Sequence, residues 1–108
     1  MLFRSRSEGD TLSLAHTVRH LGEIHQDGGR LDSAESCYGE ALAIYRADSK
    51  TGQLDLANAL RPFGILQESR GNTADAISLW KEARDIYASL GIKEGVEEGT
   101  RRLKKLEA

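Results

Sequence analysis

The chain has 108 residues, which is the size of one small domain, and its hydrophobic share of 39% is too high for a disordered protein. The net charge of −2 argues against a nucleic-acid binder, and no apolar run approaches the ~20 residues that a membrane helix needs. The single cysteine, Cys37, excludes an intrachain disulfide, and the N-terminus does not resemble a secretory signal. We therefore expect a cytoplasmic protein that binds neither nucleic acid nor membranes.

Apolar residues recur at helical spacing along most of the chain. Leu14, Val18 and Leu21 are four and three positions apart, and Ala34, Tyr38 and Ala41 repeat this spacing. No segment alternates with a period of two residues, so strands are not expected. The pattern predicts an all-α chain with helices over residues 12–28, 31–47, 53–70 and 73–90, and a fifth helix over residues 93–107.

Glycines mark the expected turns between these helices. Gly29 and Gly71 stand where the first and third helices should end in a left-handed residue. Asn72 is in position to cap the next helix, and Asp75 follows near its positive end. The chain is therefore expected to form helical hairpins.

The fifth predicted helix has acidic residues at its start and basic residues at its end. Glu94 and Glu97 belong to its first turns, and the run Arg101–Lys105 to its last, which is the order that the helix dipole favours. Its few apolar positions suit a capping helix with one face in water. We interpret the basic run as a solvated face rather than a binding patch.

The two halves of the chain repeat each other at an offset of 42 residues. Eleven residues of the segment Leu14–Tyr45 are identical to those 42 positions later. Several differences are conservative, such as Tyr38 against Trp80. This agreement predicts two similar hairpins that pack by stacking.

Within each unit, the order of residues resembles the tetratricopeptide repeat. A large residue, Leu-Gly, a turn glycine, alanine, an aromatic residue and alanine follow one another in the family pattern. In the first unit these are Val18, Leu21, Gly22, Gly29, Ala34, Tyr38 and Ala41, and in the second Leu60, Phe63, Gly64, Gly71, Ala76, Trp80 and Ala83. The 42-residue period is similar to the repeat length of the kinesin-light-chain-like subgroup of this family. The resemblance implies one tetratricopeptide-like domain over residues 1–108, an α-α superhelix of two repeats (12–47 and 53–90) and a capping helix (93–107).

Several residues depart from an ordinary helix or from the family pattern. Gly22 and Gly64 lie inside predicted helices, where glycine costs ~1 kcal/mol, so we expect a close helix approach at both. His25 and Gln67 replace the aromatic residue that closes the first helix of a repeat. Pro62 predicts a kink or an altered helix start.

The resemblance implies a protein–protein interaction module whose first helices line a concave groove for a peptide or a helix of a partner. Arg19 and Arg61 are equivalent in the two units, so the partner is expected to carry acidic groups. Glu23 stands one turn from Arg19 and offers the simpler explanation of an ordinary surface pair. The residues expected to line this groove are His16, Arg19, Glu23, Gln26, Asn58, Arg61, Ile65 and Glu68.

An alternative function is homo-oligomerisation. At the same offset, Leu2 and Phe3 correspond to the end of a second helix, and an exposed edge there would favour dimers. A frayed terminus explains the same residues equally well. His16 and His20, four apart on one helix, have the spacing of metal ligands, but no second cluster joins them, and we expect no metal site. No catalytic constellation or phosphate loop is found, so neither an enzyme nor a cofactor is expected.

Overall fold

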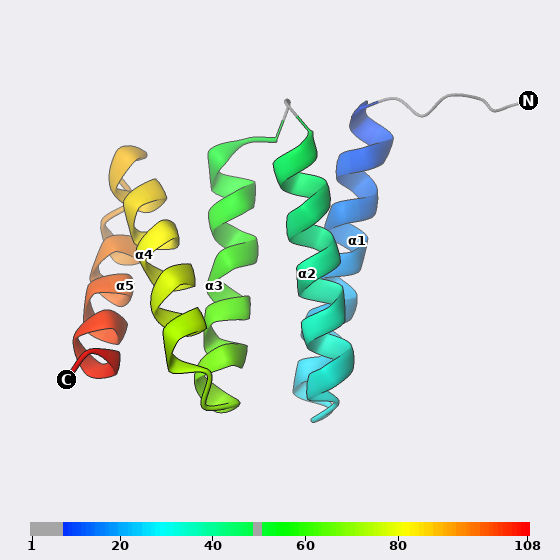
Figure 1. The fold of residues 1–108 in the computed structure, drawn as a ribbon. Helices are drawn as coiled ribbons and strands as arrows, with labels where there is room; N and C mark the ends of the chain where they lie inside the picture. Colours follow the sequence, from blue (N-terminus) through cyan, green and yellow to red (C-terminus); the bar gives the residue numbers. More distant parts are fainter. Residues whose placement is uncertain (1–7, 49–50) are drawn as a thin grey trace, which may run out of the picture. The chain divides into compact units, whose positions relative to one another are not determined.

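The computed structural model describes residues 8–48 and 51–108, which form five α-helices and, within these residues, no strand. Contacts divide the chain into two compact units, Met1–Gly52 and Gln53–Ala108. The first unit is the hairpin of α1 and α2, and the second combines the hairpin of α3 and α4 with α5 (Figure 1). The helices are α1 (Glu8–Asp27), α2 (Leu31–Ala47), α3 (Gln53–Ser69), α4 (Thr73–Ser89) and α5 (Lys93–Leu106).

These bounds confirm the all-α prediction of hairpins with a C-terminal helix. The start of the first helix was predicted wrongly, since α1 begins at Glu8 rather than at residue 12. Residues 8–11 carry no apolar periodicity, so this first turn of the helix is not visible in the sequence pattern. Leu2 and Phe3, which the oligomerisation hypothesis invoked, lie outside the described residues.

The glycine turns have the predicted left-handed conformation. Gly29 has a φ of 79° and Gly71 a φ of 78°, which a residue without a Cβ adopts at no steric cost. The amide of Gly29 donates to the Gln26 carbonyl, and that of Arg30 to the His25 carbonyl, which closes α1 with two bonds. Asn72 occupies the N-cap position of α4, but it makes no side-chain capping bond there.

Gly22 and Gly64 lie where the helices of each hairpin approach each other closely. A Cβ on Gly22 would stand 2.9 Å from Cε1 of Tyr38, and one on Gly64 would stand 2.8 Å from Nε1 of Trp80. The expected close approach is confirmed, and what fills the space is an aromatic ring of the facing helix. Six alanines of the two hairpins are completely buried, namely Ala15, Ala34, Ala41, Ala57, Ala76 and Ala83.

In the second unit, α5 packs against α4 through small residues. Gly95 faces the ring of Tyr87, and a Cβ on Gly99 would stand 2.9 Å from Cβ of Arg84. Leu103 is 3% exposed and anchors the C-terminal half of the helix. Apart from Leu103, Val96 and Leu106, the side chains of the helix are polar, as expected for one that covers a single neighbouring face.

Pro62 lies inside α3, which runs without interruption from Gln53 to Ser69. Of the two outcomes expected at Pro62, a kink or an altered helix start, the altered start is excluded, because α3 begins nine residues earlier at Gln53. Within the described residues, none of the helices is long and apolar enough to span a membrane.

Candidate functional site

The residues expected to bind a partner lie on α1 in the first unit and on α3 in the second. Each set is described within its own unit. The first and last residues of each set, which we call its outer positions, share one role. They form hydrogen bonds with aromatic side chains of the second helix of the same hairpin. The inner positions differ between the units.

The residue at the first outer position of each unit, His16 or Asn58, forms a hydrogen bond with the tyrosine near the end of the second helix. Nδ1 of His16 lies 2.5 Å from the hydroxyl of Tyr45, and the two rings are tilted with centroids 5.5 Å apart. In the second unit, the Tyr87 hydroxyl donates to Oδ1 of Asn58 over 2.9 Å. Tyr45 and Tyr87 are 1% and 5% exposed, so each polar tip needs such a partner. His16 and Asn58 therefore join the helices of their hairpins.

The residue at the last outer position, Gln26 or Glu68, accepts a hydrogen bond from the aromatic residue in the middle of the second helix. The Tyr38 hydroxyl donates to Oε1 of Gln26 over 2.7 Å, and Nε1 of Trp80 donates to Oε2 of Glu68 over 2.6 Å. Burial raises the pKa of the Tyr38 hydroxyl, and the nearby carboxylate of Glu23 raises it further. Gln26 and Glu68 are thus also engaged within their own hairpins.

Arg61 forms a two-point ion pair with Glu98 of α5. Its Nε donates to Oε1 over 2.6 Å and its Nη2 to Oε2 over 3.0 Å. This hydrogen bonding lowers the pKa of the Glu98 carboxyl and raises the pKa of the Arg61 guanidinium. The capping helix thus supplies the carboxylate for an arginine that was expected to meet an acidic partner.

A second ion pair also joins α3 and α5, but here the arginine belongs to α5 and the carboxylate to α3. Nη1 of Arg102 on α5 lies 3.1 Å from both carboxylate oxygens of Glu68 on α3. The guanidinium also stands 5.2 Å from the ring centroid of Trp80, within the range of a cation–π contact. Arg102 therefore partly neutralises Glu68 and covers the buried tryptophan.

Arg19 differs from its equivalent Arg61. Among the described residues, no hydrogen-bond partner is found for its Nε and Nη1, although both atoms are shielded from solvent. The carboxylate one turn along, Glu23, lies 3.3 Å from Nδ1 of His20 instead. Burying donors without acceptors is costly, so Arg19 is the residue of this set whose hydrogen-bonding capacity is least satisfied within the described residues. Ile65, which stands opposite Glu23 in the repeat alignment, is partly exposed.

One side of α1 carries exposed apolar side chains. Leu14 is 39% exposed, Leu21 44% and Ile24 58%. Their spacing of seven and three residues places them on a single helix face. In the second unit, Leu66 occupies the position equivalent to Ile24 and is 0% exposed. The α1 face is thus an apolar surface open to solvent.

The histidines have other contacts than a shared metal. His16 meets Tyr45, His20 meets Glu23, and Nδ1 of His25 accepts a hydrogen bond from Nε of Arg30 over 2.9 Å. Over residues 8–48 and 51–108, no three His, Cys, Asp or Glu side chains are grouped as metal ligands would be.

The ion pair of Glu98 predicts a pH-dependent contribution to stability. Because its pKa is lowered in the folded chain, the stabilisation is complete above the usual carboxyl pKa of about 4.3 and is lost as the pH falls through the lowered value. We expect Glu98→Gln to reduce the free energy of unfolding by about 1 kcal/mol at pH 7 and by less at pH 3. Urea unfolding at both pH values measures the difference.

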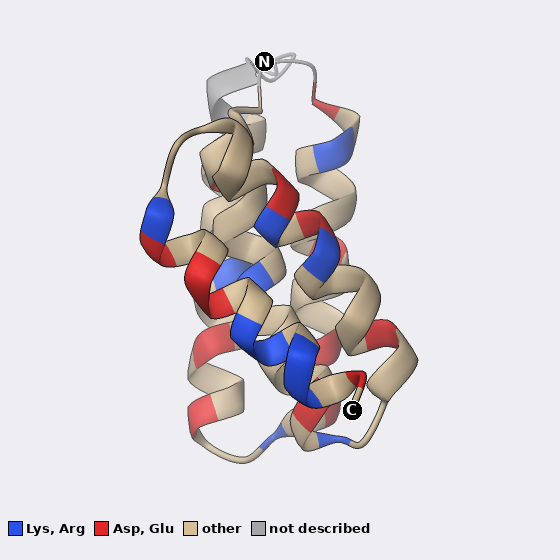
Figure 2. Ribbon diagram, turned by 90° about the vertical axis from the view of Figure 1, so that its left-hand side faces the viewer, with Lys and Arg blue, Asp and Glu red and all other residues tan. Residues whose placement is uncertain are grey.

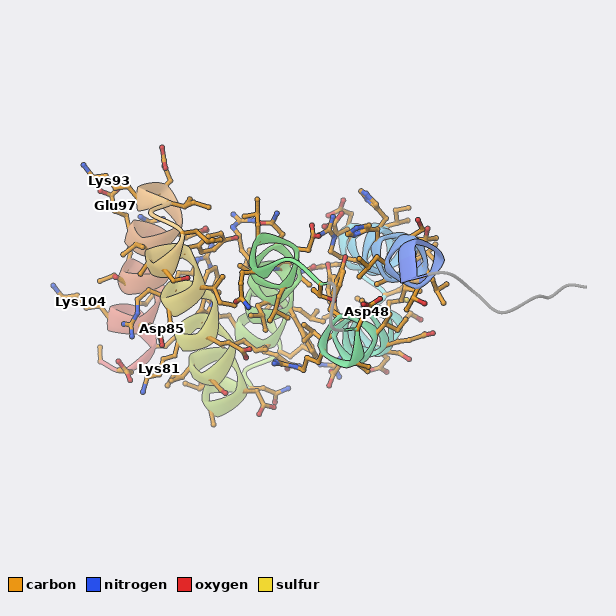
Figure 3. All side chains as sticks on the ribbon, turned by 90° about the horizontal axis from the view of Figure 1, so that it is seen from above. Asp48, Lys81, Asp85, Lys93, Glu97 and Lys104 are labelled. Carbon is orange, nitrogen blue, oxygen red and sulfur yellow. The ribbon has the colours of Figure 1, made fainter. Side chains whose placement is uncertain are left out.

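Glu97→Gln is the matched control for that substitution. Glu97 precedes Glu98 on the same helix and points away from the rest of the unit (Figure 3). Its substitution is expected to leave the free energy of unfolding nearly unchanged at either pH. Equal effects of the two substitutions would contradict a specific role for the pair of Arg61 and Glu98.

Sequence reasoning missed the internal partners of the outer positions and the ion pairs of α5. One signal was present in the repeat alignment. Tyr38 and Trp80 differ in shape but share a polar tip, and the residues that accept from them, Gln26 and Glu68, are equivalent at the same offset. No comparable repeat points to Glu98 or Arg102, because α5 has no counterpart in the first unit.

Comparison with known proteins agrees with this arrangement of hairpins. The sequence model of the family described as Tetratricopeptide repeat matches residues 10–89. A search of curated proteins finds none that matches the chain. The matched residues include both hairpins and end before α5.

Proposed function

Because the chain belongs to the tetratricopeptide repeat family, we propose that it binds a peptide or a helix of a partner protein through its first helices, α1 and α3. Tetratricopeptide repeats generally mediate protein–protein interactions, and they are typically not enzymes. The 42-residue period supports membership of the kinesin-light-chain-like subgroup. A composition with a single cysteine supports a cytoplasmic location, where thiols stay reduced.

Arg19 is the observation that carries the proposal. It occupies the same repeat position as Arg61, whose guanidinium is satisfied by two oxygens of Glu98. Within the described residues, Nε and Nη1 of Arg19 have no such acceptor. A carboxylate of a partner would pair with this guanidinium once the side chain turns outward, because Nε and Nη1 are shielded from solvent in the free chain. Such a charge-assisted bond contributes ~1.5–3 kcal/mol when solvent is excluded.

The other positions support the proposal less directly. His16, Gln26, Asn58 and Glu68 are engaged within their hairpins, so they shape the binding faces more than they offer free polar groups. The remaining positions are partly or fully exposed at the surface of each unit, namely Glu23, Arg61 and Ile65. We treat the faces of α1 and α3 as separate contributions.

The test compares two arginines of the first unit. Arg19→Gln removes the unsatisfied guanidinium, whereas Arg30→Gln removes an exposed one that contacts His25. Partners recovered on the immobilised chain are identified and purified, and their affinities are measured directly. We expect Arg19→Gln to weaken binding about ten-fold or more, and Arg30→Gln to leave it nearly unchanged. Equal affinities for both variants and the parent chain would contradict the role of Arg19.

A second candidate function is self-association through α1. The apolar face of Leu14, Leu21 and Ile24 supports it, because Leu66 at an equivalent position is buried. A second copy of the chain would cover this face. Light scattering is then expected to give a mass above 11.9 kDa that falls to this value in a Leu21→Glu/Ile24→Glu variant. A monomeric parent chain across the micromolar range would contradict it.

A further inference from the structure

A cavity of about 310 Å³ lies in the second unit between the end of α3 and the C-terminal half of α5. Its lining consists of one carboxylate, Glu68, and three cations, Arg101, Arg102 and Lys105. Only Glu68 belongs to the set of residues expected to bind a partner. The cavity is therefore a separate feature from the Arg19 face of the first unit.

The charges around the cavity do not cancel. Glu68 accepts hydrogen bonds from Trp80 and from Arg102, and Arg102 also has Glu98 3.7 Å from its Nε. These internal pairs engage Glu68, the carboxylate that lines the cavity. Arg101 and Lys105 are exposed, and in the described part of the chain neither forms an ion pair. Figure 2 shows this imbalance, because the N-terminal half of α5 is mostly acidic and its C-terminal half is basic.

The spacing of the two unpaired cations matches an extended peptide. Arg101 and Lys105 are four residues apart on α5, so their side chains leave the same face ~6 Å apart along the axis. In an extended peptide, side chains two residues apart lie on the same side, separated by ~6.6 Å. Two acidic residues with one residue between them would therefore reach both cations at once.

We propose that this cavity binds an acidic segment of a partner protein, with two carboxylates spaced two residues apart on Arg101 and Lys105. The site goes beyond the proposed function, since it requires neither Arg19 nor the first unit. Glu68 borders it and would repel a closely spaced phosphate backbone, while the chain as a whole carries a net charge of −2. Both facts favour a short acidic peptide over nucleic acid.

The probe is a fluorescein-labelled, terminally capped peptide of sequence Glu-Ser-Glu-Ser-Glu, and its binding to the full chain is followed by anisotropy. Its Gln-Ser-Gln-Ser-Gln counterpart is expected not to bind. Binding should weaken steeply between low and moderate salt, because the contacts are partly exposed. Arg101→Glu/Lys105→Glu is expected to lower the affinity ~10-fold or more, since two attractions become repulsions.

Lys93→Glu/Lys104→Glu is the matched control. It changes the net charge by the same amount on the same helix, but both side chains project away from the unit (Figure 3). This variant is expected to keep most of the affinity. Circular dichroism checks that both double variants retain the helical content of the parent.

Glu68→Gln provides a test in the opposite direction. Glutamine keeps an acceptor for Nε1 of Trp80, as Gln26 does for Tyr38, and it removes the negative charge that borders the cavity. The peptide should then bind several-fold more tightly. The proposal is overturned if the parent chain fails to bind the peptide at low salt, or if both double variants lose affinity equally. It is also overturned if Glu68→Gln has no effect on the affinity. Tighter binding of a single-stranded oligonucleotide of equal charge would likewise overturn it.

Discussion

Replacing Trp80 with alanine is expected to lower the free energy of unfolding by about 3–5 kcal/mol. This side chain is 1% exposed and fills the space beside Gly64 of the facing helix. The substitution would remove a buried ring, its bond to Glu68 and its contact with Arg102 together. A loss of this size is a large fraction of the 5–15 kcal/mol that stabilises a typical domain.

Trp80→Tyr is the control, because tyrosine is the residue that the first repeat has at this position. Tyr38 packs beside Gly22 and donates its hydroxyl to Gln26, so the smaller ring is compatible with the hairpin. We expect this variant to lose about 1–2 kcal/mol, well below the loss in Trp80→Ala. Chemical unfolding followed by circular dichroism measures both, since the chain has one tryptophan and its fluorescence is lost in either variant. Equal losses would contradict the importance of the aromatic ring.

The sequence was sufficient to predict the helices and the turns between them. Apolar residues at three- and four-residue spacing define a helix face, and Gly29 and Gly71 mark two turns because other residues resist a positive φ. Both signals are local, so one sequence reveals them. The start of α1 was missed because residues 8–11 are too polar to show periodicity, which illustrates how weakly helix ends are encoded.

The binding faces were predicted less fully, and the reason is physical. A polar residue on a first helix has the same periodicity whether it points to solvent or accepts a bond from a buried aromatic tip. His16, Gln26, Asn58 and Glu68 were expected to face a partner, but each makes a hydrogen bond to the second helix of its own hairpin. Only the positions of the facing side chains distinguish these cases.

The ion pairs of α5 were missed for a different reason. Arg61 and Glu98 are 37 residues apart, and their meeting depends on how closely α5 packs on α4 through Gly95 and Gly99. The charge order of α5 was explained by its dipole alone, which needs no partner. The pairing with α3 adds a second role to the same charges. This explains why Arg61 pairs with a carboxylate of its own unit, whereas Nε and Nη1 of Arg19, at the same place in the repeat alignment, have no acceptor among the described residues.

The glycines inside the helices give the second large expected effect, and its sign depends on position. Gly22→Ala is expected to destabilise the first unit, because the new Cβ would lie 2.9 Å from Cε1 of Tyr38 and 3.2 Å from Cβ of Cys37. Tyr38 is 1% exposed and held by Gln26, so its ring has no free space to enter. Strain of about 1–3 kcal/mol from overpacking is opposed by a gain of ~1 kcal/mol in helix propensity, which leaves a net loss of up to about 2 kcal/mol.

Gly39→Ala in the facing helix separates propensity from packing. Gly39 lies inside α2, is exposed and has nothing within 4 Å of the position of an added Cβ. Only the propensity gain applies there, so the variant should be about 0.5–1 kcal/mol more stable than the parent. Thermal and urea unfolding of the two variants compare the same chemical change in one hairpin. If Gly22→Ala also proved stabilising, the glycine would not be needed for the contact with Tyr38, and the hairpins would owe their close approach to the alanines alone.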